Sequence, residues 1–184
     1  MTDTVMMSND CSVAEARRLR ELAAWHRAYA ERAGNPAIWD ARLRTAEDLE
    51  AQASGIERAK RNAVSDRIHE LLYRNLQEVF GEGDAARRRA AISELYTEDC
   101  ELYAPPGAFV GREALDKFAG DLRATHPHFV YTPHGEPQAL HNAGRLAWGS
   151  GPSGEPADYT GTDVIIVHDG KIAALYVFLD SAPS

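Results

Sequence analysis

The sequence predicts an α+β protein in which helices come first and a curved, mostly antiparallel sheet follows. Apolar residues recur at helical spacing as far as about residue 96, whereas from residue 100 onward short apolar runs alternate with proline and glycine. The clearest strands are 159–168 and 172–179, which are joined by Asp169-Gly170, a dipeptide typical of tight hairpin turns. Helices followed by neighbouring strands are the element order of an α+β fold.

Composition excludes several classes of function. The chain has 184 residues, of which 44% are hydrophobic and 26% charged, and its net charge is −8. A nucleic-acid partner is not expected, because phosphate binding needs a basic surface. No apolar run approaches the roughly 20 residues that span a bilayer, and the first residues lack the pattern of a secretory signal. Cys11 and Cys100 are too far apart to suggest a disulfide framework or a zinc site, so we expect a cytoplasmic protein without a membrane partner.

Three regions are predicted along the chain. Residues 1–11 are expected to be disordered, residues 12–62 to form a helical hairpin and a linker, and residues 63–184 to form the α+β domain. In the hairpin, Ser12 and Glu15 have the spacing of a capping box, and Gly34 ends the first helix.

The second helix of the hairpin is expected to begin at Asn35-Pro36. Ser54-Gly55 either breaks or only kinks it. We expect Trp25 and Trp39 to pack the two helices of the hairpin together.

In the α+β domain, a helix is predicted over 66–80, and Asp84 is expected to cap the next one. Another helix is predicted over 113–124. Pro133 and Pro137 indicate a bend or bulge between neighbouring strands. The predicted strands are 100–104, 128–132, 137–141, 145–149, 159–168 and 172–179.

Asp163 is out of place in an apolar strand. Because side chains alternate along a strand, Asp163 shares a face with Tyr159, Gly161 and Ile165. Aspartate is depleted in strands and is costly to bury without a partner. The carboxyl group therefore lies in water at a strand end, pairs with a nearby arginine, or serves chemistry in a pocket where desolvation raises its pKa.

From about residue 66 onward the chain resembles the SnoaL-like branch of the nuclear transport factor 2-like superfamily. The resemblance rests on the order and spacing of five segments: ELYTEDCELYAPPG at 94–107, GREAL at 111–115, the strand at 145–148, GTDVIIVHDGKI at 161–172 and LYVFLD at 175–180. It implies a cone-shaped α+β barrel with one apolar pocket, frequently a homodimer packed through the outer face of the sheet. Relatives include cyclases, isomerases, dehydratases and proteins without catalytic activity, so the fold does not decide the function.

The ketosteroid isomerases of this superfamily allow a comparison residue by residue. By that resemblance, Asp163 matches the aspartate of the oxyanion hole, but the general base falls at Ala104. The oxyanion-hole tyrosine falls near Leu76, with Tyr73 one turn earlier as a substitute. Steroid isomerisation by the same residues is therefore not expected.

The candidate catalytic residues are Asp163, with His141 or His128 as a proton shuttle and Tyr73 as a hydrogen-bond donor. The candidate substrate-binding residues are Tyr159, Trp148, Leu76 and Val177. Core or edge packing remains an equally open interpretation of Tyr159, Trp148 and Tyr73. We expect no metal and no cofactor, because the four histidines between residues 126 and 141 lack a ligand spacing.

These residues suggest an enzyme that needs no cofactor and transfers a proton next to a carbonyl group of a small, largely apolar metabolite. Cyclisation, isomerisation and dehydration all fit. One alternative is a homodimeric module that binds a ligand without catalysis. Another is an interaction protein in which residues 12–54 bind a partner.

Overall fold

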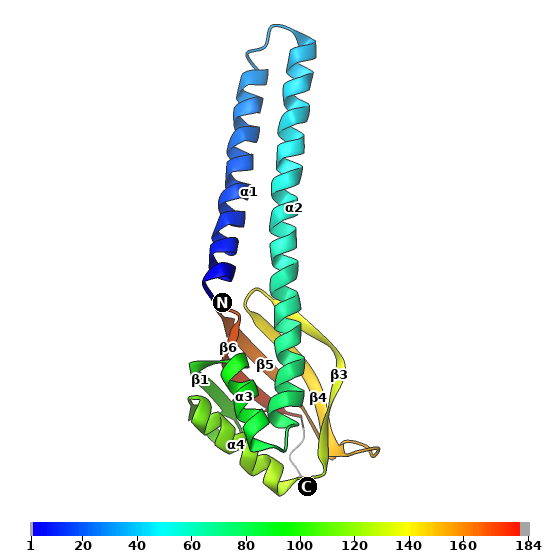
Figure 1. The fold of residues 1–184 in the computed structure, drawn as a ribbon. Coiled ribbons are helices and arrows are strands. Elements are labelled where there is room, and N and C mark those ends of the chain that lie inside the picture. The colour runs from blue at the N-terminus through cyan, green and yellow to red at the C-terminus, as the bar shows by residue number, and fades with distance from the viewer. Residues whose placement is uncertain (1, 181–184) are drawn as a thin grey trace. The chain divides into compact units, whose positions relative to one another are not determined.

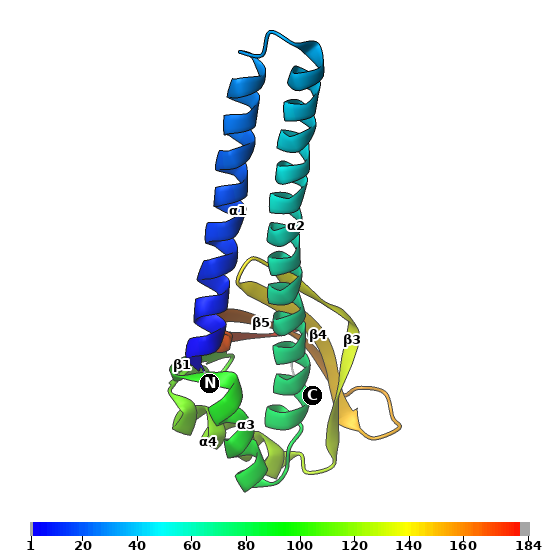
Figure 2. The same ribbon diagram turned by 45° about the horizontal axis from the view of Figure 1, so that its top comes forward.

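The computed structural model describes the backbone of residues 2–180 and the side chains of residues 11–180. The chain divides into two units, Met1–Ala63 and Val64–Ser184, close to the boundary expected between residues 62 and 63. Figures 1 and 2 show a pair of long helices in the first unit and a curved sheet with covering helices in the second. No helix in the described part of the chain is long and apolar enough to cross a membrane.

The helical hairpin consists of α1 (Thr2–Ala30) and the first part of α2 (Pro36–Arg74). Alanines spaced seven residues apart form the contact between the helices: Ala16, Ala23 and Ala30 on α1, and Ala46 and Ala53 on α2, all at most 3% exposed. Such small side chains let the two helix backbones approach closely. Ion pairs between Arg20 and Glu57 (2.6 Å) and between Arg27 and Glu50 cross the contact.

The hairpin differs from the expectations in where it begins and in how its helices pack. The first helix begins at Thr2, ten residues before Ser12, since no glycine or proline interrupts residues 2–11; the disorder expected for residues 1–11 stays a prediction. Of the two alternatives at Ser54-Gly55, the break is not seen, because one glycine costs a long helix only about 1 kcal/mol. Trp25 and Trp39 are 49% and 42% exposed, so alanines and not tryptophans pack the helices together.

The second unit begins within α2, which continues into a π-helical turn, η1 (Asn75–Phe80), so the helix predicted over 66–80 is the end of a longer one. α3 (Ala85–Leu95) follows, and the Asp84 carboxylate accepts hydrogen bonds from the backbone N–H groups of Ala86 and Arg87, as predicted for its cap. α4 spans Arg112–Thr125.

The sheet has six strands in the order β2-β1-β6-β5-β4-β3. β1 and β6 run parallel and all other neighbours run antiparallel. The strands are β1 (Tyr96–Ala104), β2 (Gly107–Val110), β3 (Phe129–Leu140), β4 (Ala143–Pro152), β5 (Tyr159–His168) and β6 (Lys171–Leu179). The two predicted strands at 128–141 are one strand whose register shifts between His134 and Gln138, at the predicted bulge. The predicted α+β class with a curved, mostly antiparallel sheet is confirmed.

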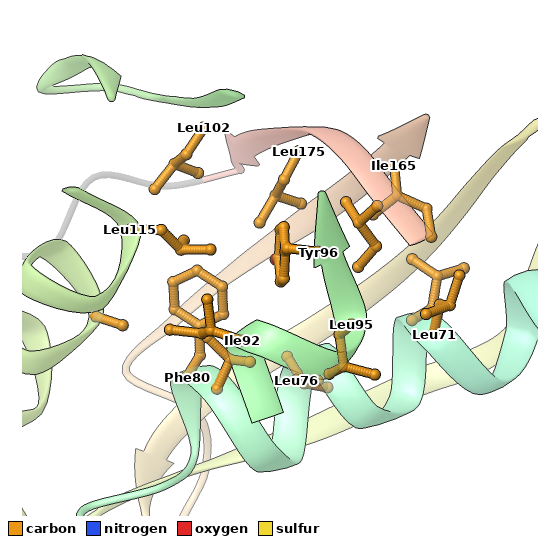
Figure 3. Packing of buried hydrophobic residues seen from close by; sticks show 14 of the residues in the cluster. Leu71, Leu76, Phe80, Ile92, Leu95, Tyr96, Leu102, Leu115, Ile165 and Leu175 are labelled. Carbon is orange, nitrogen blue, oxygen red and sulfur yellow. The ribbon is translucent and has the colours of Figure 1, made fainter. Parts of the chain in front are cut away.

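The core of this unit lies between the sheet and the helices that cover one of its faces. Figure 3 shows Tyr96 in the middle of apolar side chains from all of these elements. The fully buried members include Leu71, Leu76, Ile92, Leu95, Leu102, Leu115, Ile165 and Leu175. Within this apolar core, a few polar side chains are also buried, and the candidate site consists of three of them and their neighbours.

Candidate functional site: a buried carboxyl group and its donors

Asp163 lies in the middle of β5 with its side chain on the buried face of the sheet. Only 4% of the residue is exposed, and Tyr159, Gly161 and Ile165 on the same face are also buried. Asp163 pairs with Leu146 on β4 and with Val177 on β6. The strand alternation expected from the sequence is thus present, and the carboxyl group is not at a solvated strand end.

Two nitrogen donors hold the carboxyl group. The indole Nε1 of Trp148 donates to Oδ1 at 2.8 Å, and the amide Nδ2 of Asn75 donates to Oδ2 at 3.1 Å. The Tyr96 hydroxyl group in turn donates to Oδ1 of Asn75. Asn75 and Tyr96 are both fully buried. The arrangement is a row of polar side chains from η1, the start of β1, and the central strands β4 and β5.

A glycine on β5 makes room for the Trp148 side chain. A Cβ atom at Gly161 would lie 2.8 Å from Cζ2 of Trp148 and 2.6 Å from the Phe178 carbonyl oxygen, both closer than normal contacts allow. Gly161 is the register partner of Trp148. The missing side chain therefore lets the indole lie against β5 and reach Asp163, two residues further along the strand.

Burial raises the pKa of the Asp163 carboxyl group to about 7, and the hydrogen bonds from Trp148 and Asn75 oppose that rise. Desolvation is the larger effect, since the charged form loses its hydration while it gains only two neutral donors. No cation is among the causes of the shift. The group is consequently poised to gain or lose a proton near neutral pH.

Aromatic rings from β3, β4 and β5 accompany the carboxyl group. Trp148 lies in edge contact with Tyr131 and with Tyr159, at centroid distances of 5.4 and 5.9 Å. The hydroxyl groups of Tyr131 and Tyr159 are 3.4 Å apart. All three rings are at most 6% exposed. They provide flat apolar surface on one side of Asp163.

The other predicted site residues lie elsewhere. His128 and His141 are exposed near the two ends of β3, so the structure places neither against the buried Asp163. Tyr73 is half-buried and donates to Glu136 at 3.3 Å instead. The structure therefore does not bring a histidine or Tyr73 to this carboxyl group, because strand ends and the flank of α2 point those side chains away from it. Their roles elsewhere stay predictions.

Of the four predicted binding residues, Trp148 donates to Asp163, and Tyr159 lies in edge contact with Trp148. Leu76 is 1% exposed and belongs to the core, and Val177 is half-buried opposite Asp163. Whether any of these residues binds a substrate stays a prediction.

Sequence reasoning missed Asn75, Tyr96 and Tyr131. A signal for Asn75 was available: it follows Leu71 by four residues and Leu72 by three, and therefore lies on the apolar stripe of its helix. A polar amide on such a stripe needs a buried partner. Tyr96 and Tyr131 carried no comparable signal, because a tyrosine in an apolar run is typical of ordinary packing.

A cleft of about 690 Å³ is present elsewhere in the second unit, between α2 and strands β3 to β5. Ser65, His69, Leu140 and Arg145 are among its lining residues, and Asp163 is not. The carboxyl group is covered by its donors and aromatic neighbours, whereas we had expected it in the wall of an apolar pocket.

Comparison with known proteins agrees with this fold. The model of the SnoaL-like domain matches residues 73–175, which include Asn75, Tyr96, Trp148 and Asp163. The chain belongs to the SnoaL-like family. Comparison with the curated proteins gives no match.

Solved structures share the fold at low sequence identity. A provisionally named isomerase of the SnoaL-like family from Agrobacterium tumefaciens has 21% identity and a TM-score of 0.59, over 63% of this chain and 99% of the other. A provisionally named SnoaL-like polyketide cyclase from Jannaschia has 17% identity and a TM-score of 0.53, over 64% and 88% of the two chains. A provisionally named ketosteroid isomerase from Kribbella flavida has 16% identity and a TM-score of 0.50, over 65% and 82%. At these identities the likeness establishes the fold alone.

Proposed function

We propose that the protein is an enzyme that moves a proton next to a carbonyl group of a small, largely apolar metabolite, with Asp163 as the group that accepts and returns it. The observation that carries the proposal is a carboxyl group that is 4% exposed and has a pKa raised to about 7. A general base works best when its pKa is near the working pH. Ordinary aspartate is a much weaker base, so burial at this position has a chemical consequence.

The surroundings of Asp163 fit a flat, apolar substrate. The Trp148 ring contacts the carboxyl group and the Tyr159 ring contacts Trp148, while Val177 is the register partner of Asp163 on β6. A substrate that reaches Asp163 has to displace part of this cover, which keeps water away from the reacting atoms. The provisional isomerase and cyclase names of the structural neighbours support a reaction of this type. The reaction itself is cyclisation, isomerisation or dehydration, without a cofactor.

The test combines a titration with a reaction. Carbon-13 NMR on aspartate-labelled protein follows the Asp163 carboxyl group, which Asp163→Asn assigns. The probe for proton transfer is β-tetralone, a flat apolar ketone whose acidic C–H bonds exchange with deuterium oxide. We expect exchange above the buffer rate with the wild-type protein, and we expect Asp163→Asn to remove it.

The matched control is Asp158→Asn, which makes the same substitution at an exposed residue just before β5. It should leave both the titration and the exchange unchanged. A carboxyl pKa at or below the ordinary aspartate value would overturn the proposal. So would deuterium exchange that survives Asp163→Asn.

A second candidate is a non-catalytic interaction module, favoured by the exposed apolar side chains of α1. Leu22, Trp25 and Tyr29 are 42%, 49% and 38% exposed at helical spacing. Sedimentation of the full chain and of Trp25→Ser would test it: a complex that Trp25→Ser dissociates supports an assembly role for this face. The homodimer, the apolar ligand and the cytoplasmic location expected from the sequence remain predictions.

A further inference from the structure

Three buried side chains form a hydrogen-bonded row that ends at Asp163. Tyr96 donates to Oδ1 of Asn75, and Nδ2 of Asn75 donates to Oδ2 of Asp163 at 3.1 Å. Among the described residues, Asn75 is the one hydrogen-bond partner of the Tyr96 hydroxyl group. The direction of the row follows from the carboxylate, which can only accept hydrogen bonds.

Each member of the row restricts the next. The indole of Trp148 can only donate, so Oδ1 of Asp163 has an acceptor's role. An amide has one end that donates and one that accepts, and the Tyr96 hydroxyl group satisfies the accepting end of Asn75. With that end occupied, Asn75 turns its donating end toward Asp163. Both carboxylate oxygens then face donors and neither faces an acceptor.

Protonation of Asp163 disturbs this row. A proton on Oδ1 would face the indole N–H of Trp148, and a proton on Oδ2 would face the N–H of Asn75. Of these two partners, only Asn75 can become an acceptor, because its amide can turn over so that its oxygen accepts from Asp163. Tyr96 must then accept from Asn75, and its own hydrogen loses the partner that it had. A buried polar group without a partner is costly, so the row favours the charged form of Asp163.

We propose that Asn75 and Tyr96 are positioning residues that hold Asp163 as a carboxylate, ready to accept a proton. When the proton arrives, the Asn75 amide turns over and its oxygen accepts a hydrogen bond from the neutral acid. This deepens the proposed function and rests on it, since it assigns Asp163 the role of base in the resting protein. The substrate's C–H bond supplies the proton and the enolate keeps the electron pair. The proton returns to a carbon atom of the same substrate, which leaves atoms and charge balanced.

The groups around the row do not titrate in the same range. Burial raises the pKa of the Tyr96 and Tyr131 phenols and of the Cys100 thiol, so all three stay neutral near pH 7. The guanidinium group of Arg112 binds the Tyr96 carbonyl oxygen and keeps its charge. Asp163 is therefore the group of this cluster that changes charge near neutral pH.

Tyr96→Phe is the decisive variant, because it removes one hydroxyl group and keeps the ring that packs the core. Without that donor, Asn75 is free to turn its oxygen toward Asp163 and accept from the neutral acid. We expect the pKa of Asp163 measured by carbon-13 NMR to rise by about one pH unit, the equivalent of one ordinary hydrogen bond. An unchanged or lowered pKa would overturn the proposal.

Tyr131→Phe is the matched control. It deletes the hydroxyl group of another buried tyrosine, which is 6% exposed and whose hydroxyl group lies 3.4 Å from that of Tyr159 and is not part of the row. It should leave the pKa of Asp163 where it is. If both variants raise the pKa of Asp163 by the same amount, the loss of any buried hydroxyl group has this effect, and the hydrogen-bonded row does not explain it.

The wild-type protein supplies a measurement that does not depend on how the variants fold. Nitrogen-15 spectra should show the Asn75 side-chain amide and the Trp148 indole shifting with pH at the same midpoint as the Asp163 carboxyl carbon. The Asn75 shift should be large because its amide turns over. An Asn75 resonance that stays still through the Asp163 titration would refute the reversal.

Failure of this inference and failure of the proposed function are distinguishable. If the wild-type protein does not exchange β-tetralone protons but Tyr96→Phe raises the Asp163 pKa, the row is real and the enzyme proposal is wrong. If exchange occurs but Tyr96→Phe leaves the pKa of Asp163 unchanged, the enzyme proposal stands and this inference is wrong.

Discussion

At Asp163, two opposing effects determine the protonation state. Burial favours the neutral acid, and the donors Trp148 and Asn75 favour the anion. Because desolvation is the stronger of the two, the pKa comes to about 7 and not to its ordinary value of 3.8. Burying an ionisable group in this way costs stability, which is common at functional sites.

The stability of the protein should therefore depend on pH through this residue. The folded-state pKa is raised above the unfolded value, so the contribution of the bound proton is fully present below about pH 4 and is lost as pH rises through 7. Relative to Asp163→Asn, the wild-type free energy of unfolding should fall over that range by up to about 4 kcal/mol. Urea unfolding at several pH values measures the difference, in which all other titrating groups cancel.

Urea unfolding of Asp158→Asn at the same pH values is the control. Because this residue is exposed, the difference in the free energy of unfolding between this variant and the wild-type protein should not change over the range. A constant difference between wild type and Asp163→Asn from pH 4 to pH 8 would mean that Asp163 is not perturbed by burial.

At the scale of the elements, a close contact between helix and sheet depends on a glycine of β4. A Cβ atom at Gly144 would lie 2.2 Å from Cγ2 of Ile68 and 3.1 Å from Cδ1 of Leu72, both on α2. The helix that carries Asn75 therefore rests directly on the backbone of β4, the strand that carries Trp148. This close packing brings the two donors of Asp163 together.

Gly144→Ala should lower the free energy of unfolding by about 1–3 kcal/mol, because the added methyl group overpacks the contact between α2 and β4. It should also alter the Asp163 titration, since it moves α2 and hence Asn75. Thermal unfolding and the carbon-13 titration measure the two effects.

Gly55→Ala is the opposite control. Nothing lies within 4 Å of a Cβ atom at this exposed helical position, so alanine should stabilise α2 by about 0.5–1 kcal/mol. If Gly144→Ala lowers the free energy of unfolding no more than Gly55→Ala does, α2 and β4 do not approach as closely as described above.

At the scale of the whole molecule, the core of the second unit is complete without the helical hairpin. Among the described residues, its buried apolar cluster begins at Ile68 and ends at Leu175. The hairpin has its own contact, made by alanines. The described apolar cluster of the second unit and the alanine contact of the hairpin thus consist of different residues.

A fragment of residues 64–184 should consequently fold as a cooperative unit and keep the Asp163 titration of the full chain. Near-ultraviolet circular dichroism and the carbon-13 titration measure this. A fragment without fixed tertiary structure would contradict this prediction, because it would show that the second unit needs the hairpin in order to fold.

Local patterns in the sequence were sufficient for most elements and for the key residue. The alternation 159–167 placed Asp163 on one face with Tyr159, Gly161 and Ile165, which the structure shows to be the buried face of β5, and Asp84 was identified as a cap from its neighbours alone. The length of α2 was not predictable in the same way. Gly55 is compatible with a break or with a continuous helix, and local propensity does not decide between them.

The sequence by itself determined the α+β class, the order of its elements and the unusual position of Asp163, because helical and strand periodicity are local properties of the chain. Only the tertiary structure decided the partners of that carboxyl group. Asn75 is 88 residues away and Trp148 is 15 residues away. They meet at Asp163 because α2 lies on a glycine of β4 and because Gly161 leaves room for the indole. Such contacts depend on how helix and sheet pack, which no local pattern in the sequence records.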